Sequence, residues 1–340
     1  MRKILIPILT IILLNATLSI FYLSIPHALS VEWLDVIART DKTSYTYRNL
    51  VTIYGELQLM GNPVSGIAGV EVVNPNNQTL VTRAVPAGSP TLTNIIEIVS
   101  VTPCDIYGNP KYTFIRGKSA HVKVVIKSND LLAERHVIIT VVAYDNDSTP
   151  ILPSVKFLET DILPNSTIEY KPEFPLYTWI STGNAKFYAC VFSDWPRKGG
   201  IPYTVEKYAN FLITTSGGAA TLSINSTEGK LEESNGYYVK FRLPPDEISG
   251  APFGNYTVHV RANSQGYTGG RTITFTRAHQ ILADVNYDHN IDIIDVVLVT
   301  SKYGSKSGDP NWTPEVDLQP SGKIDISDVV VVTSKYGQKY

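Results

Sequence analysis

The stretch Tyr237–Phe275, YYVKFRLPPDEISGAPFGNYTVHVRANSQGYTGGRTITF, decides the fold because apolar and polar side chains alternate in two parts of it. In the first part, YVKFRLP, the apolar members are Val239, Phe241 and Leu243. In the second part, YTVHVRA, they are Tyr256, Val258 and Val260. A period of two is typical of a strand that buries one of its faces. The stretch therefore predicts strands of a sheet.

The same pattern recurs over much of residues 31–277. VTIYGELQL begins at Val51 and HVKVVIK begins at His121, and both alternate in the same way. Turn-forming sequences separate such segments, among them GNP at residue 61 and again at residue 108. Short strands divided by regular turns predict β-sandwiches rather than βαβ units.

Length and composition agree with this class. The chain has 340 residues, which is enough for two or three domains. Only 18% of the residues are charged, and the abundance of Tyr, Val, Thr and Ile favours β-structure. The formal net charge is −2, so no basic field favours nucleic acid, and we expect no nucleic-acid partner.

Residues 1–30 have the features of a targeting segment. A basic pair at Arg2 precedes the apolar run Ile4–Leu23, and Ala28 and Ser30 offer small residues before a cleavage point. A signal peptide is one interpretation. A retained membrane anchor is the other, because the run is long enough to cross a bilayer. Both predict a secreted or cell-surface protein, with membrane contact only through an uncleaved N-terminal segment.

Outside the cytoplasm, Asn-X-Ser/Thr triplets are acceptor sites for glycans. In the mature chain such triplets begin at Asn77, Asn146, Asn165, Asn225, Asn255 and Asn311. They predict a surface that carries glycans.

The chain has two cysteines, Cys104 and Cys190, too few to be the main staple of a protein of this length. In NAKFYACVF the side chains expected on the core side are Ala185, Phe187, Ala189 and Val191. That alternation turns Cys190 outward, where an unpaired thiol would be a liability. The sequence leaves both a Cys104–Cys190 disulfide and two unpaired thiols open.

The segment Thr40–Val85 resembles the opening strands of macroglobulin-like, immunoglobulin-like surface domains. It has an Asp-Lys…Tyr start, a strand, a G-x-P-V segment and a strand that ends in an Asn-Pro turn. Such domains finish with an F-x-L-P…G-x-Y-T-V stretch, which is missing after Val85 and turns up in Tyr237–Phe275. The resemblance implies one discontinuous sandwich made of residues 31–90 and 219–277.

Residues 91–216 would then form a second sandwich inserted in a loop of the first, which is tolerated because loop ends lie close together at the surface. This part resembles the adhesion-related immunoglobulin-like domains of bacterial and archaeal surface proteins. Three sandwiches in series are the alternative, although each flanking half is short for a sandwich. We expect a mostly β fold with two immunoglobulin-like sandwiches, one inserted in the other, in an archaeal-type secreted surface protein.

The C-terminal region repeats itself, because DIIDVVLVTSKYG from Asp292 returns as DISDVVVVTSKYG from Asp325 with eleven of thirteen positions identical. Oxygen-bearing side chains upstream have the spacing of twelve-residue calcium loops. At positions 1, 3, 5, 7, 9 and 12 the first loop has Asp284, Asn286, Asp288, Asn290, Asp292 and Asp295. The second loop has Asp317, Gln319, Ser321, Lys323, Asp325 and Asp328. Asn290 and Lys323 would contribute backbone carbonyls.

The two loops are unequal. Loop one offers four carboxylates and loop two offers three, so we expect two Ca²⁺ sites of which the second is weaker. Gly322 takes position 6 of loop two, where the chain turns sharply, whereas loop one has His289 there. The apolar residues at position 8, Ile291 and Ile324, are expected to pair the two loops.

This double pattern resembles a dockerin domain over residues 280–340, with Asp rather than Glu at position 12 of each loop. The resemblance implies a small α-helical, EF-hand-like domain and a cohesin-like or other surface protein as partner. It also implies partner contact at positions 10 and 11 of each loop, which are Ile293, Ile294, Ile326 and Ser327. The VVLV and VVVV runs are poor helix formers, so calcium and helix packing must override their propensity, and the tail is expected to loosen without calcium.

We expect no enzyme, because the histidines occur singly and no nucleophile elbow or phosphate loop is present. A structural or adhesive protein with calcium-dependent docking is the leading hypothesis. A calcium-stabilised cap without an external partner is the second, and exposure of the four partner-binding positions would discriminate between them. A module for cell-surface polysaccharide is the third, with Trp179, Trp195 and Trp312 as sugar-stacking candidates.

Overall fold

The computed structural model describes residues 34–46, 49–91, 94–215, 236–244, 251–278, 282–286, 288 and 290–339. The predicted leader, the predicted glycan acceptor Asn225 and position 6 of loop one, His289, lie outside the described residues. The described chain is mostly β, as the alternation of its side chains predicts.

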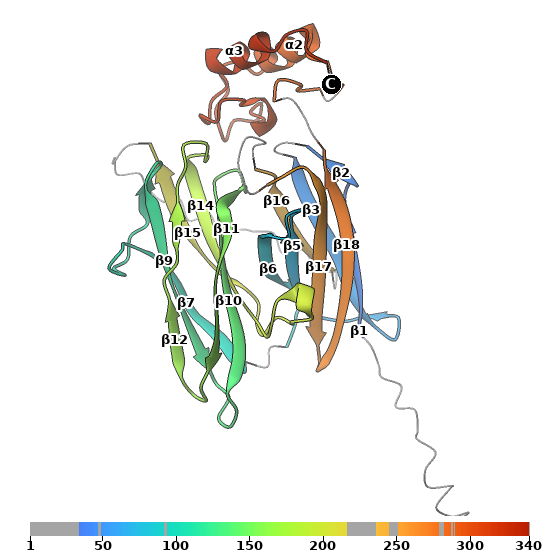
Figure 1. Cartoon of the computed structure of the whole chain (residues 1–340), viewed down its shortest axis with the longest axis vertical. Coiled ribbons are helices and arrows are strands. Elements are labelled where there is room, and N and C mark those ends of the chain that lie inside the picture. The colour runs from blue at the N-terminus through green and yellow to red at the C-terminus, as the bar shows by residue number, and fades with distance from the viewer. Residues whose placement is uncertain are drawn as a thin grey trace, which may run out of the picture. The chain divides into compact units, whose positions relative to one another are not determined.

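The sheets fall into two pairs, which we call the first and the second sandwich (Figure 1). In the first sandwich, one sheet has the strand order β1 (Leu34–Thr40), β3 (Leu50–Leu59), β16 (Gly236–Arg242), and the short β4 (Asn62–Pro63) also pairs with β3. The facing sheet has the strand order β2 (Ser44–Tyr45), β18 (Tyr267–Arg277), β17 (Gly254–Ser264), β5 (Gly66–Val73), β6 (Thr79–Ala87). In the second sandwich, one sheet has the strand order β11 (Pro150–Ile162), β10 (Arg135–Tyr144), β14 (Gly183–Phe192), β15 (Lys207–Thr214), β8 (Thr113–Ile115). The facing sheet has the strand order β12 (Thr167–Tyr170), β9 (Ser119–Ser128), β13 (Glu173–Pro175), and β7 (Ile96–Cys104) also pairs with β9.

The first sandwich combines strands from distant parts of the chain. β16 is antiparallel to β3, with Val239 opposite Ile53, and β17 is antiparallel to β5, with Val258 opposite Val72. The hydroxyl of Tyr237 donates to the backbone carbonyl of Ile37 at 2.9 Å, across 200 residues of sequence. The strands after residue 235 thus complete sheets that begin before residue 88, which is the pairing that an inserted second sandwich requires.

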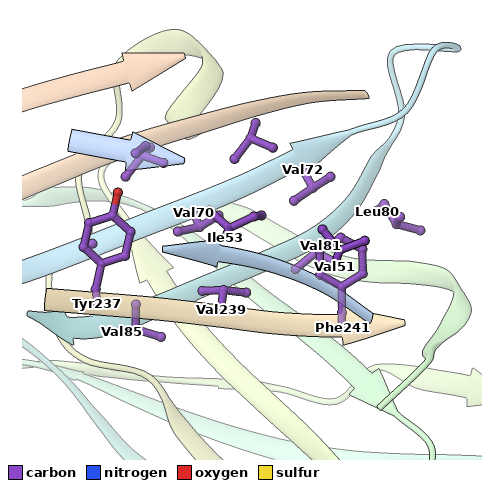
Figure 2. Close-up of a cluster of buried hydrophobic side chains, with 14 of the residues drawn as sticks. Val51, Ile53, Val70, Val72, Leu80, Val81, Val85, Tyr237, Val239 and Phe241 are labelled. Atoms are coloured by element: carbon purple, nitrogen blue, oxygen red, sulfur yellow. The ribbon is translucent and has the colours of Figure 1, made fainter. Parts of the chain in front are cut away.

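Alternating side chains of these strands form the core of the first sandwich. Figure 2 shows Val51 and Ile53 of β3 and Phe241 of β16 among side chains of β5 and β6, such as Val70 and Val81. All five are fully buried. Each buried aliphatic or aromatic side chain contributes about 1.5–3 kcal/mol relative to an exposed one. The faces that the alternation predicts as apolar are therefore the faces that hold the two sheets together.

In the second sandwich, the predicted inner face of β14 is confirmed, because Ala185, Phe187, Ala189 and Val191 all belong to its core. The outer face of β14 differs from the prediction. Cys190 is fully buried there, since this face packs against the first sandwich and forms a small apolar cluster with Ala84 and Phe192. At Gly69 of β5, a Cβ atom would lie 2.7 Å from the Phe192 ring, so the close approach of the two sandwiches requires glycine.

Of the two alternatives that the sequence leaves open for Cys104 and Cys190, the structure has the two unpaired thiols and not the disulfide. Both cysteines are free and fully buried. Cys104 ends β7 in one sheet of the second sandwich, whereas Cys190 is on β14 in the other sheet and faces away from that sandwich. Burial raises the pKa of the Cys190 thiol well above its ordinary value, so the thiol stays protonated and inert, and packing removes the liability that pairing was expected to remove.

Two ion pairs cross between the sandwiches. Arg83 of β6 binds Glu206 at 2.5 Å, and both side chains are about nine-tenths buried. The Arg83 guanidinium also lies 3.7 Å from the centre of the Tyr188 ring of β14. In the second pair, Arg197 binds the fully buried Glu71 of β5 at 3.1 Å. Each sandwich contributes one cation and one anion, so the charges of these two pairs are matched across the junction.

The C-terminal region, which we call the tail, contains α2 (Ile293–Ser301), the 3₁₀ turn η2 (Pro314–Val316) and α3 (Ile326–Ser334). Two aspartates three residues apart start each long helix, and both form a capping box. At α2, the amide of Ile294 donates to Asp292 at 2.7 Å, and the amide of Asp292 donates to Asp295 at 2.9 Å. Asp325 and Asp328 repeat this arrangement at α3. These caps offset the low helix propensity of the valine-rich runs.

The two halves of the tail brace each other through backbone hydrogen bonds. The amide of Gly304, just after α2, donates to the carbonyl of Ile324 at 2.8 Å, and the amide of Gly337, just after α3, donates to the carbonyl of Ile291 at 2.7 Å. Both glycines have a positive φ, 86° and 84°, which ends each helix. The backbone of each position-8 isoleucine also joins its loop to the end of the opposite helix, since the amide of Ile291 donates to Gln338 and the amide of Ile324 donates to Ser305. Both isoleucines are buried in the core of the tail.

We expect Arg83→Ala to lower the free energy of unfolding by about 3–5 kcal/mol, because it leaves the Glu206 carboxylate buried without its cation. Chemical denaturation of the chain followed by circular dichroism measures this. The control is Arg135→Ala, which removes a more exposed ion pair with Asp130 and should cost about 1 kcal/mol or less. Equal costs for the two variants would show that the pair between the sandwiches does not stabilise the fold.

Candidate metal centre

The first and last carboxylates of each predicted calcium loop are buried. Asp284 and Asp295 in loop one and Asp328 in loop two are fully buried, and Asp317 in loop two is 1% exposed. Carboxylates are rarely buried unless hydrogen bonds or a cation compensate for the lost water. Four such side chains in the short tail are therefore the feature that calls for a chemical explanation.

Backbone amides supply part of that compensation. In loop one the Asp295 carboxylate accepts hydrogen bonds from Val285 at 2.7 Å and from Asn286 at 3.2 Å. In loop two the Asp328 carboxylate accepts one from Gln319 at 2.7 Å. Position 12 thus ties the start of each loop to the first turn of the helix that follows. Both of these amides of loop one donate to Oδ1 of Asp295, whereas Oδ2 accepts the amide of Asp292 and keeps a lone pair for a cation.

The first position folds each loop back on itself. The amide of Asp288 donates to Asp284 at 3.2 Å, and the amide of Ser321 donates to Asp317 at the same distance. In loop two Gly322, at φ 76°, adds a second bond to Asp317 at 2.9 Å. Gly322 thus has the left-handed backbone that the sequence predicts for position 6.

The pKa values of two carboxylates of loop two shift in opposite directions. Burial raises the pKa of Asp328 above its ordinary value, although backbone hydrogen bonds from Gln319 and Asp325 offset part of this effect. Hydrogen bonds from the hydroxyl and the amide of Ser327 lower the pKa of Asp325. The hydrogen bonds of the protein thus compensate the ionised form of Asp325 better than that of Asp328, and a bound cation would favour the ionised form of Asp328.

The middle positions of the loops are at the surface, where they bond to one another. The Asn286 side chain donates to the Asp288 carboxylate at 2.8 Å, and that carboxylate also accepts from the amide of Asn290 at 2.8 Å. In loop two the hydroxyl of Ser321 donates to the carbonyl of Lys323 at 2.8 Å. The exposed Gln319 completes this set. These are the oxygens that would turn to a cation in exchange for their present partners.

Within the described ranges, no three His, Cys, Asp or Glu side chains are grouped so as to hold a metal ion. The predicted ligand sets reach six members only with amide, hydroxyl and carbonyl oxygens, which such a grouping does not include. By chemical type the residues fit Ca²⁺, which takes six to eight oxygen ligands. In the structure, the carboxylates at positions 1 and 12 of each loop are buried. The residues at the middle positions form hydrogen bonds with one another.

The predicted partner-binding isoleucines are exposed. Ile293 and Ile294 are 59% and 50% exposed, and Ile326 is 63% exposed. Ser327 is half-buried, and its amide donates to the side chain of Asp325, which caps α3. Further apolar side chains missed at the sequence level are also exposed, at matching positions of the repeat: Val297 and Val330, and Tyr303 and Tyr336. The signal that could have found Val297 and Val330 is their spacing of four from Ile293 and Ile326 on a helix.

The predicted glycan acceptors among the described residues differ in exposure. Asn77, Asn165, Asn255 and Asn311 are exposed, as acceptors of a glycan must be. Asn146 is half-buried, and its side chain donates to the Ser307 hydroxyl at 3.3 Å and accepts from the amide of Asn184 at 3.1 Å. A glycan there would replace one hydrogen of the amide nitrogen that makes the first of these bonds.

The tryptophans named as sugar-stacking candidates pack inside the protein. Trp195 is 5% exposed, and Trp179 and Trp312 are half-buried against the cores of the sandwiches and of the tail. They do not form an exposed, planar row on one sheet. The polysaccharide hypothesis therefore has no support from these three side chains.

Comparison with known proteins gives no family, because no family model and no curated protein matches the chain. Among solved structures, the C-terminal domain of wzt matches with a TM-score of 0.31 and 8% identity, over 40% of this chain and 84% of that one. Red sea bream transglutaminase matches with a TM-score of 0.25 and 13% identity, over 55% and 32% of the two chains. A β-glucosidase from Listeria innocua matches with a TM-score of 0.23 and 12% identity, over 35% and 16%.

This chain thus spans most of the first of these proteins and a third or less of the other two. Likenesses of this size carry no argument about activity. Over the part of the chain that the structure describes, no helix is both long and apolar enough to cross a membrane.

Proposed function

We propose that this chain is a non-catalytic structural or adhesive protein of the cell surface or the secreted fraction, whose tail binds two Ca²⁺ ions and joins it to a partner protein. The observation that carries the proposal is the pair of buried aspartates in each loop, next to a helix that exposes isoleucine. Two loop–helix units with this arrangement are what the resemblance to a dockerin domain predicts. The same resemblance makes a cohesin-like sandwich the expected partner.

Bound calcium would supply the positive charge that compensates the buried, ionised carboxylates. In loop one the oxygens of Asp284, Asp288, Asp292 and Asp295 would hold it, together with Asn286 and the carbonyl of Asn290. In loop two Asp317, Asp325 and Asp328 would hold it, together with Gln319, Ser321 and the carbonyl of Lys323. Because loop two has one carboxylate fewer, its affinity should be the lower one.

The exposed apolar side chains of the helices support an external partner. Ile293, Val297, Ile326 and Val330 are each more than half exposed, although they lie close to the buried core of the tail. Interfaces with a stable partner have an apolar centre of this kind. A polar contact from Arg242 of β16 to Glu315 favours the second candidate, a cap that packs on its own sandwiches. The isoleucines of the helices stay exposed with this contact in place, and their exposure favours docking of an external partner over a cap without one.

The immunoglobulin-like character of the sandwiches is part of the proposal. The Tyr256 hydroxyl of β17 donates to the carbonyl of Pro252, four residues upstream, at 2.9 Å. A tyrosine that bonds back in this way is a feature of immunoglobulin-like domains. Surface domains of this class act as spacers and contact modules. An archaeal-type surface protein, a contact to cell-surface polysaccharide and either fate of the leader stay predictions.

Calorimetric titration of the chain from residue 31 with CaCl₂ should give two binding events of unequal affinity. Asp284→Ala should remove the tighter one and Asp317→Ala the weaker one, because each takes away the first ligand of one loop. The control is Asp35→Ala, which removes an exposed carboxylate of β1 and should leave both events unchanged. Absence of calcium uptake by the unaltered chain would overturn the proposal.

The double substitution Ile293→Ser with Ile326→Ser should weaken binding of a cohesin-type domain by at least about tenfold, which corresponds to about 1.4 kcal/mol. The calcium stoichiometry should stay at two, since neither side chain is a ligand. Leu131→Ser is the matched control, because Leu131 is 74% exposed but lies in the second sandwich. Surface plasmon resonance with calcium and with chelator measures both effects. Equal affinities for the double variant and the control would argue against docking through the helices.

A further inference from the structure

Both outer ends of the sandwich region belong to the first sandwich. β1 starts at Leu34, after the predicted leader, and β18 ends at Arg277, before the tail. The second sandwich, from Ile96 of β7 to Thr214 of β15, is connected to the first at both of its ends, between β6 and β16. Since both connections lead to the same folded body, a pull between the leader and the tail stretches the first sandwich and leaves no tension across the second.

The strands at these two outer ends run side by side in the same direction. A Cβ atom at Gly269, near the start of β18, would lie 1.8 Å from the carbonyl oxygen of Leu34. At the other end of β18, Arg277 pairs with Tyr45 in a parallel arrangement. The segment 34–45 thus follows β18 along its length (Figure 1). Opposite pulls on Leu34 and Arg277 therefore slide these strands along each other and do not peel them apart.

Sliding is resisted by a row of backbone hydrogen bonds. β1 pairs with β3 along its whole length, from Leu34 opposite Leu59 to Thr40 opposite Ile53. Hydrogen bonds between antiparallel strands are perpendicular to the strands. A force along β1 therefore acts on all of these bonds at once, and they must break together before the strand moves.

The end of β18 is held by buried groups where a pull from the tail enters. The amide of Ala278 donates to the carbonyl of Tyr45 at 2.8 Å. The buried Tyr45 ring stands edge-on to the ring of Phe275, with 5.2 Å between their centres. The guanidinium of the buried Arg277 donates to the carbonyl of Pro244 at 2.7 Å. We call β1, β2 and β18 with these contacts the clamp.

The second sandwich has a core of its own. The members of this core all come from residues 96–213. Among them the Phe187 ring of β14 stacks on the Phe211 ring of β15, with 4.1 Å between their centres, and both are fully buried. This core does not depend on the clamp, so the second sandwich can stay folded when the first one opens.

We propose that the first sandwich carries the tension on this protein through its clamp and that the inserted second sandwich is shielded from it. This inference rests on the proposed function for the source of the tension, which is a partner bound to the tail of a chain held at the cell surface. Two sandwiches in series would both feel the full force, and the weaker one would open first. Insertion lets the second sandwich keep its shape, and any contact surface on it, for as long as the clamp holds.

Optical tweezers that pull the chain from residue 31 by its two ends measure the order of opening. A Gly-Ser insertion of about ten residues lengthens the step of the sandwich that carries it by about 35 Å. The insertion sites are the exposed turn at Gly61 in the first sandwich and the exposed loop at Leu132 in the second. The step lengthened at Gly61 should come before the step lengthened at Leu132, and opening of the tail should be changed by neither insertion. The reverse order would overturn the proposal.

Three valine-to-alanine variants locate the resistance. Val36 of β1 is in the clamp, Val81 of β6 is in the same core at the opposite edge of the sheet that contains β18, and Val141 of β10 is in the core of the second sandwich. At constant force, Val36→Ala should raise the opening rate of the first sandwich at least about fivefold, because forced opening depends on the contacts that break at its barrier. Val81→Ala should change this rate less than about twofold, and Val141→Ala should leave it unchanged.

Each contrary result has its own meaning. A faster first opening in Val141→Ala would overturn the shielding of the second sandwich, and equal rates in Val36→Ala and Val81→Ala would overturn the assignment of the resistance to the clamp. These measurements use neither calcium nor a partner. A chain that opens in the expected order but takes up no calcium would therefore lose the proposed function and keep the shielding, whereas the opposite pair of results would overturn the shielding alone.

Discussion

The pairing of β16 with β3 and of β17 with β5 is the constraint on which the rest of the structure depends. These strands arrive after the whole second sandwich and complete sheets that begin near the start of the described chain. The first sandwich cannot close without them, so its folding must bring distant segments together at a large cost in loop entropy. The junction of the sandwiches and the attachment of the tail at Arg242 both follow from this closure.

The junction shows how one strand can serve two cores. β5 is buried along its whole length, because one face lies in the first sandwich and the other packs on the second. Gly69 and Glu71 are on that second face, where one allows close approach and the other pairs with Arg197. A buried ion pair contributes less to stability than to the choice of one arrangement, since any other arrangement would leave its charges unpaired.

The alternation of side chains predicted the strands and the inner faces well, because burial of one face is a local property of a strand. The prediction failed at Cys190, because the face of β14 that carries this residue is covered by a part of the chain more than a hundred residues away in sequence. The helices α2 and α3 were predicted only through the calcium-loop spacing, since their valines favour strands. The capping boxes, each an Asp-x-x-Asp pair, were present in the sequence and start both helices. The contact of Arg242 with Glu315 of the tail depends on tertiary structure, and no local pattern contains it.

We propose that calcium further stabilises the tail, whose backbone is already held by the capping boxes and by the hydrogen bonds between each loop and the end of the opposite helix. Hydrogen exchange at the amides of Gly304, Gly337, Ile291 and Ile324, which brace the two halves, tests it most directly. The account predicts that exchange at all four amides slows on addition of calcium to the full chain and speeds up again with chelator, while the core strand β10 stays unchanged. Equal exchange rates at these amides with and without calcium would contradict it.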